Sequence, residues 1–181
     1  MTNFRFTHCL IGCSILLDIV IIPGCAGKFG TTAQPSEAEL CGRLQEVVAQ
    51  ADSEFRKFKT TPTISPFSGM TKWETKPVFP ESQCDVLEWA GGQTNYVCTW
   101  PETAEAAARA TQIDTSTRIG TCLGRDWSRA DNRGQTGGAA IFTRPGTKAQ
   151  VVMRYFRPRQ GLGDRWETSL TIGDEVKAET R

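Results

Sequence analysis

The chain has 181 residues, of which 39% are hydrophobic and 23% charged, and its net charge is +1. This composition is typical of a folded globular protein and excludes a disordered chain. The charge is uneven: residues 28–108 hold 7 Lys and Arg against 11 Asp and Glu, whereas residues 109–181 hold 13 against 8.

The opening of the chain has the layout of a secretory signal. Arg5 supplies a basic start, an apolar run follows from Cys9 to Ile22, and small residues come next. This run is too short for a helix that crosses a hydrocarbon core of ~30 Å, which needs roughly 20 residues. Asp18 lies inside the run, which also argues against a permanent membrane span. We therefore expect residues 1–25 to be a signal peptide.

Ile22-Pro23-Gly24-Cys25 ends this leader. The four residues resemble the lipobox of bacterial lipoproteins, in which an aliphatic residue and two more residues, the second of them small, precede a cysteine. Pro23 takes the place of a residue that is usually small. The resemblance implies that Cys25 receives a diacylglyceryl group and becomes the new N-terminus, so that its acyl chains anchor the protein in a membrane. The alternatives are ordinary cleavage after Ala26, which releases a secreted or periplasmic protein, and a merely apolar core helix.

Residues 26–35 are rich in Gly and Thr and are expected to form a flexible tether. If the cell is Gram-negative, Ala26 in place of Asp after Cys25 resembles the sorting pattern of outer-membrane lipoproteins. The anchored domain would then face the periplasm or the exterior, on a cell membrane or an outer membrane.

Four cysteines follow the leader: Cys41, Cys84, Cys98 and Cys122. An even number in an exported protein predicts two disulfides, and the spacing is too wide for a C-x₂₋₄-C zinc site. Cys84 and Cys98 lie equally far from Gly91 in a predicted hairpin, so they would face each other. Cys41 and Cys122 each lie beside the apolar face of a predicted helix. We favour the pairs Cys84–Cys98 and Cys41–Cys122, although the sequence leaves the other pairings open.

Two helices are predicted. Ser36 and Glu39 form the capping-box pattern of a helix start, and apolar residues at intervals of three and four extend the helix over residues 37–59. These apolar residues are Leu40, Leu44, Val47, Val48, Ala51, Phe55 and Phe58. Pro101 opens a second, alanine-rich helix over residues 102–123.

Six strands are predicted from β-branched and aromatic runs that Gly and Pro bound. They span residues 71–76, 84–89, 94–100, 139–144, 149–157 and 165–172. Residues 60–69, 125–138 and 158–164 are expected to be loops, and 174–181 a charged tail. The order of elements predicts a single α+β domain over residues 36–173: an antiparallel sheet with two helices on one face, in a possible αβββ-αβββ arrangement.

Little catalytic chemistry is available to the mature chain. His8, the only histidine, lies in the leader, so Ser-His-Asp, Cys-His and His-metal chemistry are excluded. The sequence has no GxSxG, HExxH or GxxxxGK[ST] motif. A carboxylate pair that acts on a glycan is the remaining option, with Glu74, Glu88, Asp126 and Asp131 as candidates. We predict no enzyme, no cofactor and no metal.

Arg and aromatic residues are the candidates for partner binding, because these types dominate interface energetics. They are Trp127 in its polar loop and the cluster Arg154, Tyr155, Arg157, Arg159, Arg165 and Trp166. The alternatives are core packing for the aromatic side chains and a solvated sheet face for the arginines.

The sequence therefore predicts a non-catalytic, lipid-anchored binding or structural module of the cell envelope. The basic C-terminal half suits an anionic partner, which in an exported protein is lipid, envelope polymer or an acidic protein rather than nucleic acid. A secreted or periplasmic inhibitor or immunity-type protein that occludes a partner enzyme is the alternative.

Overall fold

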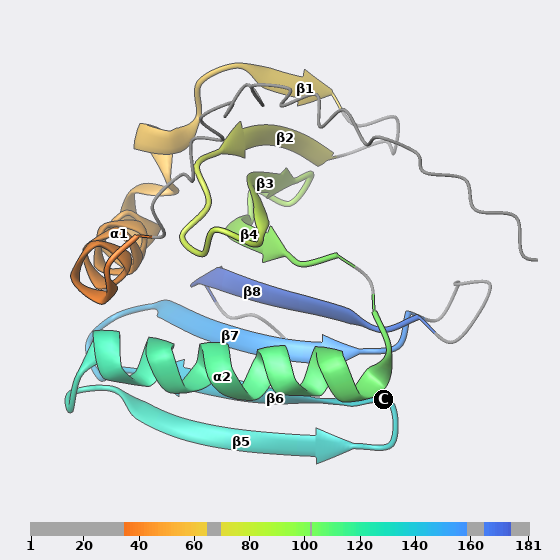
Figure 1. The fold of residues 1–181 in the computed structure, drawn as a ribbon. Coiled ribbons are helices and arrows are strands. Elements are labelled where there is room, and N and C mark those ends of the chain that lie inside the picture. The colour runs from red at the N-terminus through yellow and green to blue at the C-terminus, as the bar shows by residue number, and fades with distance from the viewer. Residues whose placement is uncertain (1–34, 65–69, 102, 159–164, 175–181) are drawn as a thin grey trace, which may run out of the picture. The chain divides into compact units, whose positions relative to one another are not determined.

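The computed structural model describes residues 35–64, 70–101, 103–158 and 165–174. The lipobox, Arg159, and most of the expected tether and tail lie outside these ranges. Within them the chain forms an eight-stranded antiparallel sheet with two helices packed against one face (Figure 1). The α+β class expected from the sequence is confirmed, and the number of strands is higher than expected.

Each half of the domain is a helix followed by four strands. The first half holds α1 (Glu37–Ala49), the short 3₁₀ turns η1 (Ala51–Ser53) and η2 (Arg56–Phe58), β1 (Pro62–Ile64), β2 (Met70–Thr75), β3 (Gln83–Trp89) and β4 (Thr94–Thr99). The second half holds α2 (Glu105–Leu123), β5 (Ser128–Gly134), β6 (Gly137–Thr143), β7 (Ala149–Phe156) and β8 (Glu167–Asp174).

The strand order is β1-β2-β3-β4-β8-β7-β6-β5, so each half is a meander and the last strands of the two halves meet at the centre. β4 and β8 run antiparallel, with Val97 opposite Thr171. The arrangement is therefore αββββ-αββββ instead of αβββ-αβββ.

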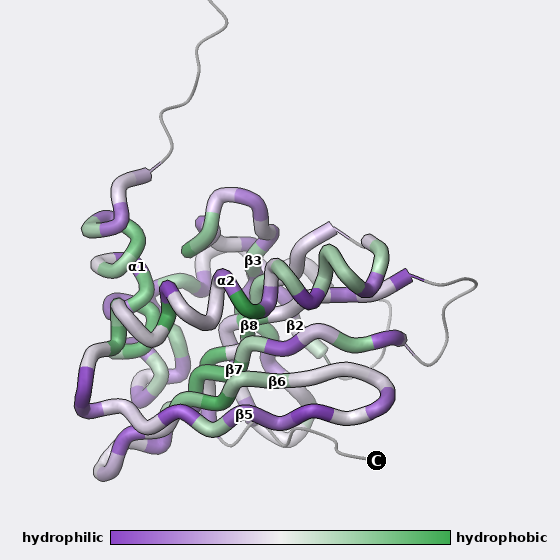
Figure 2. The backbone as a smooth tube through the Cα atoms, turned by 60° about the horizontal axis from the view of Figure 1, so that its bottom comes forward, coloured by the Kyte–Doolittle hydropathy of each residue, from purple (hydrophilic) through white to green (hydrophobic). Residues whose placement is uncertain are grey.

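Both additional strands lie at the edges of the sheet, in segments expected to be loops. β5 has the sequence SRADNRG and every one of its residues is exposed; Figure 2 shows its hydrophilic character. It pairs with β6 along its whole length. Because backbone groups make these bonds, β5 needs no apolar face, and the apolar pattern that reveals other strands is missing. β1 has only three residues.

The first helix ends at Ala49, ten residues before the predicted end. Glu54 and Phe55 adopt positive φ angles of 57° and 56°, which reverse the chain between the two 3₁₀ turns. This reversal buries Phe55 completely, with its ring 6.2 Å from that of Tyr96. The apolar spacing therefore continues past Ala49 because Phe55 belongs to the core, although the backbone there is no longer α-helical.

The core lies between the helices and the sheet. Leu40 and Leu44 of α1 and Ile119 of α2 are fully buried, and they pack in one cluster with side chains from β3, β4 and β6–β8. The Ser36 hydroxyl accepts a hydrogen bond from the Glu39 N–H, and the Glu39 carboxylate accepts one from the Ser36 N–H, so the expected capping box starts α1. The second helix starts at Glu105, three residues later than predicted, because Thr103 first pairs with Trp166.

Two disulfides connect these elements. Cys41–Cys122 joins α1 to α2, and Cys84–Cys98 joins residues directly opposite each other on β3 and β4. Both pairs are those favoured from the sequence. Disulfides persist in oxidising compartments and are rare in the cytosol, so they are consistent with an exported domain. No helix among the described residues is long and apolar enough to cross a membrane.

The two disulfides should contribute unequally to stability. They close loops of 81 and 14 residues, and loop-closure entropy in the unfolded chain predicts losses of about 4.5 and about 3 kcal/mol when they are removed. We expect the Cys41→Ser/Cys122→Ser variant to unfold at a lower guanidinium chloride concentration than Cys84→Ser/Cys98→Ser. Equal midpoints at equal m-values would contradict this order.

Gly137 starts β6 with a φ of 148°, and a Cβ there would lie 2.1 Å from the backbone oxygen of Tyr155. We expect Gly137→Ala to lower the free energy of unfolding by about 1–3 kcal/mol, because the β6–β7 pairing must shift. Gly91→Ala is the matched control, since nothing lies within 4 Å of its added Cβ. Its effect should stay within about 0.5 kcal/mol. Chemical denaturation measures both, and a harmless Gly137→Ala would refute the close contact.

Candidate functional site

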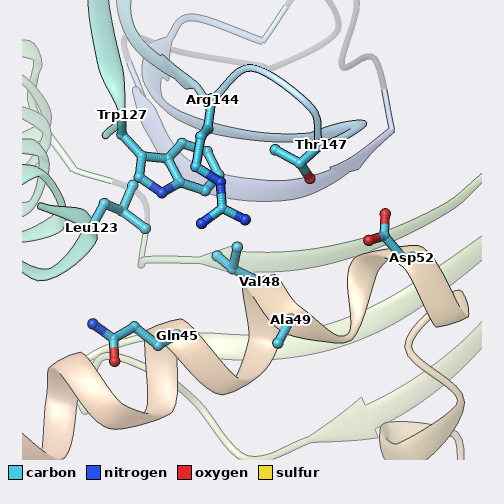
Figure 3. Close-up of a pocket in the computed structure, with 8 residues that line it drawn as sticks. All are labelled: Gln45, Val48, Ala49, Asp52, Leu123, Trp127, Arg144 and Thr147. Atoms are coloured by element: carbon cyan, nitrogen blue, oxygen red, sulfur yellow. The ribbon is translucent and has the colours of Figure 1, made fainter. Parts of the chain in front are cut away.

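A cleft of about 220 Å³ lies where α1 and α2 both end (Figure 3). α1, the turn η1 and the end of α2 supply one wall, and the segments that precede β5 and follow β6 supply the other. Its lining residues are Gln45, Val48, Ala49, Asp52, Leu123, Trp127, Arg144 and Thr147.

The helical wall is held together by two bonds between α1 and the end of α2. One is the Cys41–Cys122 disulfide. The other is a hydrogen bond of 2.8 Å that the Gln45 amide nitrogen donates to the backbone oxygen of Cys122. Leu123 follows directly and lines the cleft, so both bonds fix its position relative to α1.

The opposite wall is a stacked pair, Trp127 and Arg144. The pairing of β5 with β6 brings them together. Ser128, the residue after Trp127, lies opposite Thr143, the residue before Arg144. The guanidinium carbon of Arg144 lies 5.3 Å from the centre of the indole ring. Trp127 also packs against the main core. A cation stacked on an aromatic face contributes about 0.5–1 kcal/mol at an exposed site, and the stacking restricts the orientation of the guanidinium.

The charged groups of the cleft are not paired with each other. Among the described residues, Arg144 has no carboxylate partner and Asp52 has no cationic partner. Figure 3 shows Asp52 and Arg144 on different walls, with the apolar side chains Val48 and Leu123 between the stacked pair and the helices. The indole N–H of Trp127 likewise has no acceptor in the described part of the chain.

A second, broader groove crosses the sheet face that the helices leave open. Leu87, Trp89, Asn95, Val97 and Thr171 contribute to its lining. The Trp89 side chain is 47% exposed. The side-chain oxygen of Asn95 is buried and has no hydrogen-bond partner. A residue at position 173 other than glycine would collide with this amide, because an added Cβ would lie 2.1 Å from the Asn95 oxygen.

The described members of the arginine–aromatic cluster do not share one surface. Tyr155 and Trp166 are 9% and 8% exposed and pack with Ala108 on the helix side of the sheet, so they are core residues. Arg154 lies on the other face, where its Nε donates to the Ser169 hydroxyl at 3.0 Å.

Arg157 and Arg165 are exposed and each takes part in further interactions. Arg159 lies outside the described residues. Of the residues proposed for partner binding, Trp127 lines the cleft and Arg154 lines the open-face groove.

The four candidate acids do not converge either. Glu74 on β2 lies opposite Asp85 on β3. Glu88, also on β3, faces the other side of the sheet, and its carboxylate oxygen lies 2.5 Å from the Lys59 Nζ. Asp126 and Asp131 belong to the opposite edge of the sheet, where Asp131 pairs with Arg129. The described residues contain no group of three or more His, Cys, Asp or Glu side chains that could hold a metal ion.

Comparisons with family models, with curated proteins and with solved structures find no match to this chain.

Sequence reasoning missed most of the cleft. Gln45, Asp52 and Arg144 are ordinary surface residues in the sequence, and only the tertiary fold brings them together. The one available signal was Trp127, a large aromatic residue in an otherwise polar stretch.

Arg144 should contribute little to stability, because the residue is exposed and its guanidinium stacks on the face of the Trp127 indole. We expect Arg144→Ala to lower the free energy of unfolding by at most about 1 kcal/mol. Trp127→Ala should cost about 2 kcal/mol or more, since the ring packs against the core. Urea denaturation of both variants tests this difference, and a loss above about 2 kcal/mol in Arg144→Ala would make Arg144 a structural residue.

Proposed function

We propose that this chain is a non-catalytic binding module of the cell envelope, held at a membrane by a lipid on Cys25. The observation that carries the proposal is the pair of disulfides. A domain that is closed by two such bonds suits an oxidising compartment outside the cytosol. The Ile22-Pro23-Gly24-Cys25 sequence supplies a reason for a domain of this kind to remain at the membrane.

Lipid anchoring fits the order of the segments. Cys25 precedes α1 by a short stretch rich in Gly and Thr, which would let the folded domain move relative to the bilayer. A single acyl chain gives marginal binding and two suffice, so a multiply acylated cysteine would hold the domain firmly.

The cleft supports a binding role. It places one guanidinium and one carboxylate on different walls, and the apolar side chains of Val48 and Leu123 lie between the Trp127–Arg144 pair and the helices. Groups so arranged can hold a charged ligand in one orientation. A general base needs a partner or substrate proton within hydrogen-bond reach, and the candidate acids of this chain are spread over both edges of the sheet.

The anchor is tested by intact mass spectrometry of the full chain after expression in a bacterium with lipoprotein processing. We expect the protein to begin at Cys25 and to carry several acyl chains, and reduction should add four hydrogens for two disulfides. Cys25→Ser is the control and should remain unacylated. An unmodified chain that begins at Gly27 would instead indicate cleavage after Ala26 and a free, exported protein.

The binding role is tested by capture of partners from envelope extracts and by incubation with isolated peptidoglycan. We expect saturable retention of an envelope component without release of soluble fragments. Release of fragments that Glu74→Gln or Glu88→Gln abolishes would refute the non-catalytic proposal. If the chain instead captures one enzyme in a 1:1 complex and that enzyme loses its activity, the chain is an inhibitor and not an envelope module.

A further inference from the structure

We infer that the cleft between the helix ends and the Trp127–Arg144 pair binds a free α-amino acid with an apolar side chain. The inference rests on the proposed binding function and specifies its ligand. It requires three features in one cavity: a subsite for a carboxylate, a subsite for an ammonium group, and an apolar surface beside them.

The carboxylate subsite is the wall formed by Trp127 and Arg144. A guanidinium offers parallel N–H donors that match the two oxygens of a carboxylate. Stacking on the indole leaves the edge of the guanidinium for such bonds, and in the described part of the chain no acid occupies it. The Trp127 N–H adds a donor on the same wall.

The ammonium subsite is the opposite wall. Asp52 supplies a carboxylate that no described cation neutralises. Gln45 does not belong to this subsite, because its amide lies at the other end of the cleft from Asp52, where it donates to the Cys122 carbonyl (Figure 3). The C-terminal ends of α1 and α2 also carry partial negative charge, which favours a cation near them.

The apolar surface and the volume define the size of the ligand. Val48, Ala49 and Leu123 form the apolar part of the helical wall. A volume of about 220 Å³ lies below the roughly 300–1,000 Å³ of pockets that take drug-sized molecules. A single amino acid fits this space, whereas a long peptide or a glycan chain would extend beyond it.

Arg144 and Asp52 do not simply neutralise each other across the cleft. They lie on different walls and form no ion pair, so each retains its hydrogen-bonding capacity. A zwitterion satisfies both at once. A simple anion would bind Arg144 but be repelled by Asp52. A simple cation would be attracted by Asp52 but repelled by Arg144.

The test is an NMR titration of the full chain with L-leucine, followed through the indole N–H resonance of Trp127. This resonance is assigned as the one that disappears in the Trp127→Phe variant. We expect a saturable shift with a Kd of about 1 mM or tighter. Leucinamide lacks the carboxylate and 4-methylpentanoate lacks the ammonium group, and each should bind at least about tenfold more weakly. No shift up to about 50 mM leucine would overturn the inference, and so would 4-methylpentanoate binding as tightly as leucine.

Variants locate the site. Arg144→Ala and Asp52→Asn should each weaken leucine binding at least about tenfold, because each removes one charge partner. Arg133→Ala is the matched control, because Arg133 is an exposed arginine on β5 that does not line the cleft. This variant should bind leucine as tightly as the unaltered chain does. Undiminished binding to both Arg144→Ala and Asp52→Asn would overturn the assignment to this cleft. Neither result would alter the acylation of Cys25 or the capture of an envelope partner, so failure of this inference is distinguishable from failure of the proposed function.

Discussion

The covalent bond between α1 and α2 is the constraint on which the cleft depends. Cys41 lies in the first half of the domain and Cys122 near the end of the second helix, and the chain between them contains the whole β1–β4 meander. Because the bond closes such a long loop, it restricts the unfolded chain strongly. In the folded protein it also holds the end of α2 beside the first half of α1, and the hydrogen bond from Gln45 to Cys122 strengthens the same junction.

The second organising contact is the antiparallel pairing of β4 with β8. It joins two meanders of the same order into one sheet and places the most buried strands at the centre. Leu170 and Ile172 on β8 are fully buried, as are Val86 on β3 and Tyr96 on β4. The Tyr96 hydroxyl donates to the Lys76 carbonyl at 2.6 Å, and burial raises the pKa of this phenol. The centre is thus tightly packed, whereas the two edge strands β1 and β5 have three and seven residues.

Much of the fold was predictable from local patterns. The capping box at Ser36 and Glu39, the Gly91-Gly92 reversal and the alternating strand 149–157 are signals that the structure confirms. The disulfide pairs followed from the same patterns. β5 was not predictable in this way, because its pairing uses backbone groups and its side chains carry no apolar alternation. The end of α1 was missed because burial of Phe55 preserves the helical spacing after the helix has ended.

The candidate site was far less predictable than the fold. Aromatic and arginine residues were expected to cluster along 154–166, yet alternate positions of a strand face opposite sides of the sheet, which separates Arg154 from Tyr155. The cleft instead combines side chains from α1, from η1, from the end of α2 and from the segments that precede β5 and follow β6. No short pattern in the sequence encodes such a convergence, since it depends on strand register and on the packing of two helices.

The fully exposed β5 has a consequence for how copies of the protein meet one another. An unpaired strand at the edge of a sheet is a template on which other chains can assemble, and proteins discourage this with charged side chains. β5 carries Arg129, Asp131 and Arg133 within seven residues, and no hydrophobic residue larger than alanine. The charged edge would keep neighbouring copies from joining their sheets into fibres.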